Sequence, residues 1–247
     1  MDHNIDHRSS SIQLLAIIML FLSVTSPGFG QNTDRNTMGS WMVFSMDNQL
    51  TERFSLPVVG ILCTEDLAQQ TEFGFIRSGI SYAPNPRTKV TLGIAYVDSQ
   101  PLHHYEFESL TTQFWLYEQA TLRSGTHFRH RLRLEHRWIE KPNDALFNTR
   151  FRYRLEFKQR LNETFYLKCS NEPFFNFEQH YIDQNRFFLG LGCRLAKDLY
   201  FEAGYFKTHI KSTQIDRIRV VVHLKTEFFE RKAAPLTRNS KNNNLSK

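Results

Sequence analysis

Residues 127–138 have the sequence HFRHRLRLEHRW, in which charged and apolar side chains alternate. Successive side chains of a β-strand point to opposite faces, so an extended chain here separates charge from apolar surface. One face carries Arg129, Arg131, Arg133, Glu135 and Arg137, and the other carries Phe128, Leu132, Leu134 and Trp138. The alternation predicts a strand with one polar and one apolar side.

The segment 147–158 repeats this pattern. Its polar face carries Arg150, Arg152, Arg154, Glu156 and Lys158, and its apolar face carries Phe147, Phe151, Tyr153, Leu155 and Phe157. If the two segments are neighbouring antiparallel strands, their basic rows lie side by side and repel each other. We expect glutamates of this and nearby strands to separate the arginines, namely Glu118, Glu135, Glu156, Glu172 and Glu202.

Alternation with a period of two continues through almost the whole chain between residues 39 and 229, whereas helical spacing of apolar residues is nearly absent. We predict strands at 40–46, 52–62, 72–82, 88–97, 110–121, 126–140, 147–158, 164–175, 184–195, 199–208 and 217–228. Most of them are longer than the roughly five or six residues of an ordinary soluble strand. Strands of about ten residues are typical of a barrel that crosses a bilayer.

The connections between these segments alternate in length. Residues 47–51, 84–87, 122–125, 159–163 and 196–198 are short, and 63–71, 98–109, 141–146, 176–183 and 209–216 are longer. Short periplasmic turns and longer outer loops are typical of outer-membrane barrels. Eleven segments do not fit the even strand number usual for such barrels. Either residues 32–38 add a strand or one segment is wrongly assigned.

The sequence therefore predicts an all-β fold, a single antiparallel up-and-down transmembrane β-barrel of about 10–12 strands. About eight strands already give an interior that side chains can just fill, so an apolar lumen in a wider barrel would leave a void. We expect the apolar faces to meet lipid, with Trp41, Tyr82, Tyr96, Trp138, Tyr153 and Tyr205 near the interfaces. The predicted lumen charge network is Glu118, Arg129, Arg131, Arg133, Glu135, Arg137, Arg150, Arg152, Arg154, Glu156, Glu172, Arg186 and Glu202.

The two ends of the chain differ from the barrel in composition. Residues 1–30 have a basic residue, an unbroken apolar stretch at 14–22 and small residues after it, the order of a secretory signal peptide. We expect a short segment at 31–38, the barrel at 39–229 and a basic tail at 230–247. The tail holds five basic residues and one acidic residue, so most of the formal charge of +6 lies there and does not indicate nucleic-acid binding.

Motifs for catalysis, cofactors or metals are weak in this sequence. It has no G-x-S-x-G, H-E-x-x-H, P-loop or dinucleotide-binding pattern, and Cys63, Cys169 and Cys193 lack the spacing of a zinc site. Cys169 and Cys193 fall on successive predicted strands, which leaves a disulfide open. His103 and His104 lie together in a predicted outer loop, where a solvated loop is the better interpretation. We predict no catalytic, cofactor-binding or metal-binding residue.

Several short motifs resemble an uncharacterised bacterial family, domain of unknown function 2490. They are Tyr117-Glu118-Gln119, HRLRLEHR at 130–137, Arg150-Phe151-Arg152-Tyr153, Asn171-Glu172-Pro173-Phe174, Asp183-Gln184-Asn185-Arg186 and Gly204-Tyr205. The likeness covers about residues 39–229. It implies a β-barrel with a signal peptide in the bacterial outer membrane, and it assigns no activity.

Three function classes stay open. A narrow, anion-preferring pore would use the basic lumen to attract small anionic solutes. A closed barrel would have a structural or lipid-handling role, and a lipid-modifying hydrolase would need a nucleophile beside a histidine on the outer wall. Outer-membrane lipids and the barrel-assembly machinery are the expected partners in each case. If the charges form a packed network, Arg133→Ala or Arg152→Ala destabilises the barrel.

Overall fold

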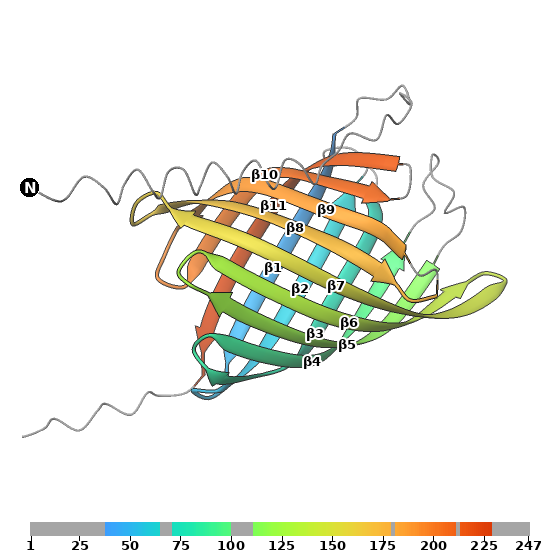
Figure 1. The fold of residues 1–247 in the computed structure, drawn as a ribbon, viewed down its shortest axis with the longest axis horizontal. Helices are drawn as coiled ribbons and strands as arrows, with labels where there is room; N and C mark the ends of the chain where they lie inside the picture. Colours follow the sequence, from blue (N-terminus) through green and yellow to red (C-terminus); the bar gives the residue numbers. More distant parts are fainter. Residues whose placement is uncertain (1–37, 65–70, 100–110, 179–180, 211–212, 229–247) are drawn as a thin grey trace, which may run out of the picture.

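The structure is a computed structural model and describes residues 38–64, 71–99, 111–178, 181–210 and 213–228. These residues form one closed barrel of eleven strands (Figure 1). The strands are β1 (Gly39–Gln49), β2 (Phe54–Thr64), β3 (Thr71–Asn85), β4 (Thr88–Ser99), β5 (Thr111–Ser124), β6 (Phe128–Lys141), β7 (Asp144–Arg160), β8 (Phe165–Asn176), β9 (Tyr181–Arg194), β10 (Leu199–Ile210) and β11 (Thr213–Glu227). All eleven predicted strands are present, with boundaries at most four residues from those expected.

The barrel closes through a parallel contact between its first and last strands. Every other neighbouring pair is antiparallel, so with eleven strands β1 and β11 run in the same direction. Their register places Val43 beside Val221 and continues along the full length of β1. A parallel pair uses the backbone hydrogen-bonding groups of both edges, so an odd number leaves no open edge. Eleven lies within the predicted 10–12 strands. The described strands close without a twelfth, and none of the eleven predicted segments was wrongly assigned.

Five short connections lie at one end of the barrel, which we call the short-turn end. They are residues 50–53, 86–87, 125–127, 161–164 and 195–198, and β1 and β11 finish at the same end. At the opposite end the chain passes from β2 to β3, from β4 to β5, from β6 to β7, from β8 to β9 and from β10 to β11. The predicted signal peptide and basic tail, and His103 and His104, lie outside the described residues.

Two of the predicted long connections are short. Strand β6 ends at Lys141 and β7 begins at Asp144, so only two residues connect them. The hairpin that they form projects beyond the neighbouring strands (Figure 1). Residues 140–147 of this hairpin are exposed or partly exposed on both faces, so the apolar–polar alternation that marks a strand is lost there. Similarly, β10 ends at Ile210 and β11 begins at Thr213.

The two faces of the wall have different compositions. Large apolar side chains such as Ile80, Leu92 and Leu191 are 56–61% exposed on the outer face. The inner face holds the buried charges and a set of large aromatic residues. Trp41, Phe188 and Phe206 belong to one buried cluster, and Trp115 packs with Phe75 in a second one. Trp41 therefore faces the lumen, which contradicts its predicted place at a membrane interface.

A glycine on β4 makes room for one of the lumen aromatics. The ring of Tyr117 covers Gly93, and the Tyr117 hydroxyl donates a hydrogen bond to the Ser78 carbonyl at 3.2 Å. A Cβ atom on Gly93 would lie 2.5 Å from the Tyr117 ring carbon Cζ and closer still to the Ser78 carbonyl. The tyrosine can occupy this position only because the residue beneath it has no side chain.

We expect Gly93→Ala to lower the free energy of unfolding by about 1–3 kcal/mol, because the extra methyl group overpacks the lumen. Gly60→Ala is the control, since a Cβ atom at Gly60 meets no atom within 4 Å. Urea unfolding in detergent, followed by tryptophan fluorescence, measures both variants. Equal stability of the two variants would contradict the tight fit of Tyr117 over β4.

The three cysteines are free thiols and do not pair. Cys63 is buried in the lumen, where its Sγ lies 3.1 Å from a Glu72 carboxylate oxygen. Cys169 lies opposite Leu189, and Cys193 lies opposite Phe165, so four residues along the strands separate the two thiols. The register excludes the disulfide that the sequence left open.

Candidate functional site

The structure gathers the predicted charge network inside the barrel, with one exception. Arg129, Arg131, Arg133, Glu135, Arg137, Arg150, Arg152, Arg154, Glu156, Glu172, Arg186 and Glu202 lie on the inward faces of β6 to β10. Glu118 lies on the outer face of β5, where its side chain is 48% exposed. Its placement in the lumen was wrong, because Trp115 and Tyr117 are the residues of this strand that point inward.

Two glutamates form the centre of the network. Glu135 accepts hydrogen bonds from Arg150 and Arg152, each at 2.7 Å, and lies 3.5 Å from Arg133. Glu172 pairs with Arg152 at 2.9 Å, with Arg154 at 2.5 Å, and with Arg131. Glu135 is fully buried and the Glu172 side chain is 1% exposed. Two buried carboxylates therefore hold five guanidinium groups, and Arg152 bridges them.

The strand register explains why the carboxylates are needed. Arg133 lies directly opposite Arg152, and Arg131 lies directly opposite Arg154, so like charges face each other across β6 and β7. Like charges in direct opposition destabilise a sheet. Glu135 lies two residues after Arg133 on β6, and Glu172 lies on β8. The negative charges of these two carboxylates offset the repulsion between the arginine rows.

A second group of charges lies nearer the short-turn end. Lys168 pairs with Glu202 at 2.9 Å and with Glu156 at 3.3 Å, and Arg129 lies 3.4 Å from Glu156. The Tyr166 hydroxyl donates a hydrogen bond to Glu202 at 2.9 Å. The sequence prediction identified the two glutamates and Arg129 but omitted Lys168, whose strand shows a weaker alternation of charge.

Aromatic rings, as well as carboxylates, contact the lumen arginines. The guanidinium carbon of Arg152 lies 4.2 Å from the centroid of the Phe174 ring, and that of Arg186 lies 4.8 Å from the centroids of both Trp41 and Phe174. Such contacts with a ring face stabilise a desolvated guanidinium group. The interior is a mixed layer of arginine and aromatic side chains.

Three further lumen arginines were absent from the predicted network. Arg217 pairs with Glu72, and the guanidinium group of Arg219 lies over the Phe188 ring, 4.9 Å from its centroid. Both residues are on the polar face of the last strand, so its alternation could have identified them. Arg77 stands alone in an apolar segment, and no pattern in the sequence points to it.

Several side chains at the middle of the lumen are inaccessible to water. Glu135, Glu172, Phe174 and Phe188 all face the interior, and each of them is at most 1% exposed. Side chains that line an open channel are wetted by it. The arginine, glutamate and aromatic side chains of β6, β8 and β9 therefore pack closely at this level.

The outer wall carries a small polar group of its own. The His136 imidazole lies 3.5 Å from a Glu118 carboxylate oxygen through Nε2 and 3.4 Å from the Thr149 hydroxyl through Nδ1. A hydroxyl, an imidazole and a carboxylate in line are the parts of a nucleophilic site. The backbone N–H of Thr149 is bound to Glu178 at 2.8 Å, so it is not free to stabilise an oxyanion. Thr149 itself therefore supplies no free N–H for an oxyanion.

No cluster of three or more histidine, cysteine, aspartate or glutamate side chains suited to a metal ion occurs among the described residues. No helix in this described part of the chain is long and apolar enough to span a membrane.

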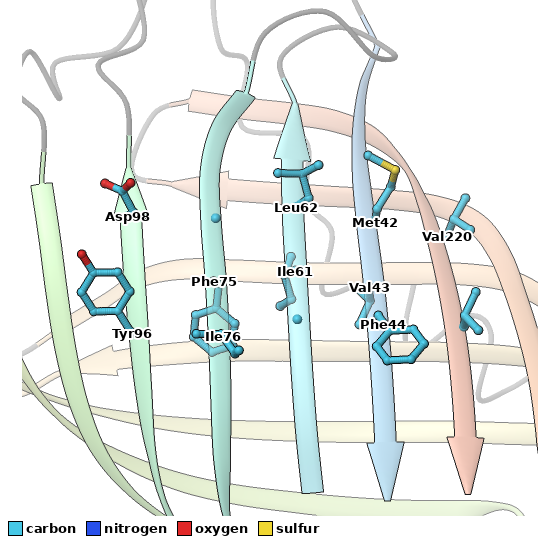
Figure 2. Close-up of a pocket in the computed structure, with 13 residues that line it drawn as sticks. Met42, Val43, Phe44, Ile61, Leu62, Phe75, Ile76, Tyr96, Asp98 and Val220 are labelled. Atoms are coloured by element: carbon cyan, nitrogen blue, oxygen red, sulfur yellow. The ribbon is translucent and has the colours of Figure 1, made fainter.

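A shallow hollow interrupts the outer wall over β1 to β4 and β11 (Figure 2). Met42, Phe44, Leu62, Ile76 and Val220 line it with apolar side chains. Its floor includes two positions without side chains, Gly60 and Gly74, which lower the surface between their neighbours. Tyr96 and Asp98 add a phenol hydroxyl and a carboxylate to this otherwise apolar lining.

Comparison with known families gives one match, to the family described as a protein of unknown function, DUF2490, over residues 38–219. Neither the curated proteins nor the solved structures contain a match. The matched residues run from the start of β1 into β11 and include the whole Arg/Glu network. This eleven-stranded barrel with its charged interior belongs to the DUF2490 family.

Proposed function

We propose that this protein is a bacterial outer-membrane β-barrel whose lumen is closed at its middle, so that it does not conduct in its resting state. The observation that carries the proposal is the distribution of side chains, which is the reverse of that in an ordinary soluble protein. Charges such as Glu135 and Arg152 are buried inside, while Ile76, Leu92 and Leu191 are more than half exposed outside. Lipid covers such an apolar outer face, and water does not favour it.

Aromatic pairs near both ends of the wall support a membrane setting. Phe54 packs with Tyr82 at the short-turn end, and Trp138 packs with Phe114 and Phe147 at the other end. Aromatic side chains are favoured at the two interfaces of a bilayer. In this orientation the short turns face the periplasm, and insertion depends on the barrel-assembly machinery.

One residue of the wall tests the membrane setting directly. We expect Glu118→Leu to raise the stability of the barrel in phospholipid vesicles by about 1 kcal/mol, because an ionisable group on a lipid-facing wall is costly. Thr112→Leu is the control, since Thr112 lies at the end of the same strand. Folding titrations in urea with vesicles measure both variants. A loss of stability in Glu118→Leu would show that this wall does not face lipid or that the pair with His136 is structural.

Single-channel recording in planar bilayers tests the closed lumen. The folded wild-type protein is expected to give no discrete conductance steps, because the arginine and aromatic side chains fill the central layer. Incorporation of the protein into the bilayer is verified by its resistance to protease. Discrete steps from the wild-type protein would refute the closed barrel.

The second candidate function is a narrow, anion-preferring pore, and one observation favours it. Five arginines surround two glutamates at the centre, and Arg77, Arg186 and Arg219 add positive charge without an ion pair among the described residues. A basic lumen concentrates anions. Anion-selective steps in the same recordings would favour this function.

A further inference from the structure

The hollow in the outer wall has a floor without side chains that crosses two strands. Gly60 on β2 lies opposite Ile76, and Gly74 on β3 lies opposite Leu62, so the two glycines are diagonal neighbours. Phe44 on β1 lies on the other side of Gly60. A Cβ atom at either glycine would meet no atom within 4 Å. The bare backbone at Gly60 and Gly74, here called the glycine trough, therefore runs between large apolar side chains.

A carboxylate lies at one end of the glycine trough. Asp98 on β4 is directly opposite Gly74, and it lines the hollow together with Tyr96 (Figure 2). The Asp98 side chain is exposed, and it forms no ion pair or hydrogen bond with another residue in the described part of the chain. Because Gly74 has no side chain, the space beside this carboxylate is open to a ligand.

The position of Asp98 along the wall suits a lipid headgroup. Tyr96 lies opposite Phe114, which packs with Trp138, and such aromatic side chains are favoured at a bilayer interface. Asp98 follows Tyr96 by two residues, toward the end of β4 at Ser99. In the proposed membrane setting, the carboxylate is level with the headgroups, and the glycine trough runs from it toward the acyl chains. An ionisable group on such a wall is costly without a partner.

We propose that the glycine trough binds one phospholipid whose headgroup carries a primary ammonium group. The ammonium group pairs with the Asp98 carboxylate, since its N–H donors form charge-assisted hydrogen bonds with such an acceptor. One acyl chain lies over Gly74 and Gly60 and covers the apolar flanks of Phe44 and Ile76. An anionic headgroup is repelled by the same carboxylate. The site rests on the proposed membrane setting and does not depend on whether the lumen conducts.

The first test measures headgroup selectivity. The full chain is folded in detergent micelles and mixed with phosphatidylethanolamine or with phosphatidylglycerol of the same acyl chains, and native mass spectrometry counts the lipids retained. We expect one phosphatidylethanolamine per barrel, bound at least tenfold more tightly than phosphatidylglycerol. Asp98→Asn should abolish this difference. Glu118→Gln is the matched control, because it removes the same charge from another carboxylate of the outer wall, one that lies beside His136.

The second test fills the glycine trough. Gly60→Leu should weaken retention of phosphatidylethanolamine at least tenfold and leave the unfolding temperature unchanged, because a side chain at this position has free space. Gly74→Leu is made as well, so that failure of one variant to fold leaves the other as the test. Ala120→Leu is the control, since Ala120 lies outside the hollow, opposite the exposed Val90. It should retain the lipid as the wild type does.

Several results would overturn the proposal. They are the absence of retained lipid, equal retention of the two lipids by the wild-type protein, unchanged selectivity in Asp98→Asn, and wild-type retention by both glycine variants. A dimer of barrels without lipid in the same spectra would assign the hollow to a second copy of the chain. Failure to insert into vesicles would refute the membrane setting, whereas an inserted barrel that retains no lipid would refute this site alone.

Discussion

Glu172→Gln is expected to lower the free energy of unfolding by about 3–5 kcal/mol, the cost of breaking a buried ion pair from one side. Glu172 pairs with Arg131, Arg152 and Arg154, and its side chain is 1% exposed. The amide keeps the shape of the carboxylate and removes its charge. Three guanidinium groups are then left close together in a region that water does not reach.

Thermal and urea unfolding in detergent, read by the shift in electrophoretic mobility between folded and unfolded barrel, measure this effect. Glu118→Gln is the matched control, because it changes the same side chain on the outer face, where it is about half exposed. We expect the control to stay within about 1 kcal/mol of the wild type, because Glu118 is not buried in the lumen and its removal leaves no cation unpaired there. Similar losses in both variants would contradict the central role of Glu172.

A double variant tests the charge argument separately from packing. Arg131→Met removes one of the three cations that Glu172 compensates and keeps a side chain of similar length. Glu172→Gln combined with Arg131→Met should therefore be more stable than Glu172→Gln alone. A strictly additive double variant would show that the loss comes from geometry and not from unpaired charge.

The same reasoning changes the expectation for the arginines. The sequence predicted that Arg152→Ala destabilises the barrel, which requires that the variant leave carboxylates unpaired. In the structure, Glu135 keeps Arg150 and Arg133, and Glu172 keeps Arg131 and Arg154. Because cations are in excess, loss of one arginine leaves each carboxylate compensated. We expect Arg152→Ala to cost less stability than Glu172→Gln.

The sequence was most informative where the two faces of a strand differ in chemistry. Along β6 and β7 every inward position from Arg129 to Arg137 and from Arg150 to Arg154 is charged, and each of these assignments agrees with the structure. On β5 both faces are largely apolar, because Trp115 and Tyr117 point inward while Phe114 and Leu116 point outward. The alternation of apolar and polar residues then does not show which face of β5 points into the lumen. The prediction therefore placed Glu118 on the wrong face.

The aromatic part of the lumen was missed for a related reason. An eleven-stranded barrel is too wide for charged side chains of only a few strands to fill, so large rings such as Trp41, Phe174 and Phe206 complete the interior. Hydrophobic periodicity assigns such residues to the lipid face. The parallel pairing of the first and last strands could not be predicted for a different reason. Whether these two strands run in the same direction depends on the total number of strands, and no local sequence pattern contains that number.

Removal of the central layer is expected to convert the silent barrel into a conducting one. Phe174 is fully buried, and the guanidinium groups of Arg150, Arg152 and Arg186 lie within 4.9 Å of its ring centroid. Arg152→Ala combined with Phe174→Ala empties the middle of the lumen and leaves both glutamates paired. We expect discrete conductance steps in planar bilayers, with anions preferred because the remaining lumen charges are mostly arginine.

Arg152→Ala combined with Phe175→Ala is the control for this opening. Phe175 follows Phe174 on β8 but points outward, where it is 37% exposed, so its truncation leaves the lumen layer in place. The control should stay silent or nearly so, while the Phe174 variant conducts at least tenfold more. If the Phe174 variant folds and remains silent, other side chains close the lumen. If both variants conduct equally, Arg152 alone is the barrier, and the aromatic ring serves only to hold the arginines in position.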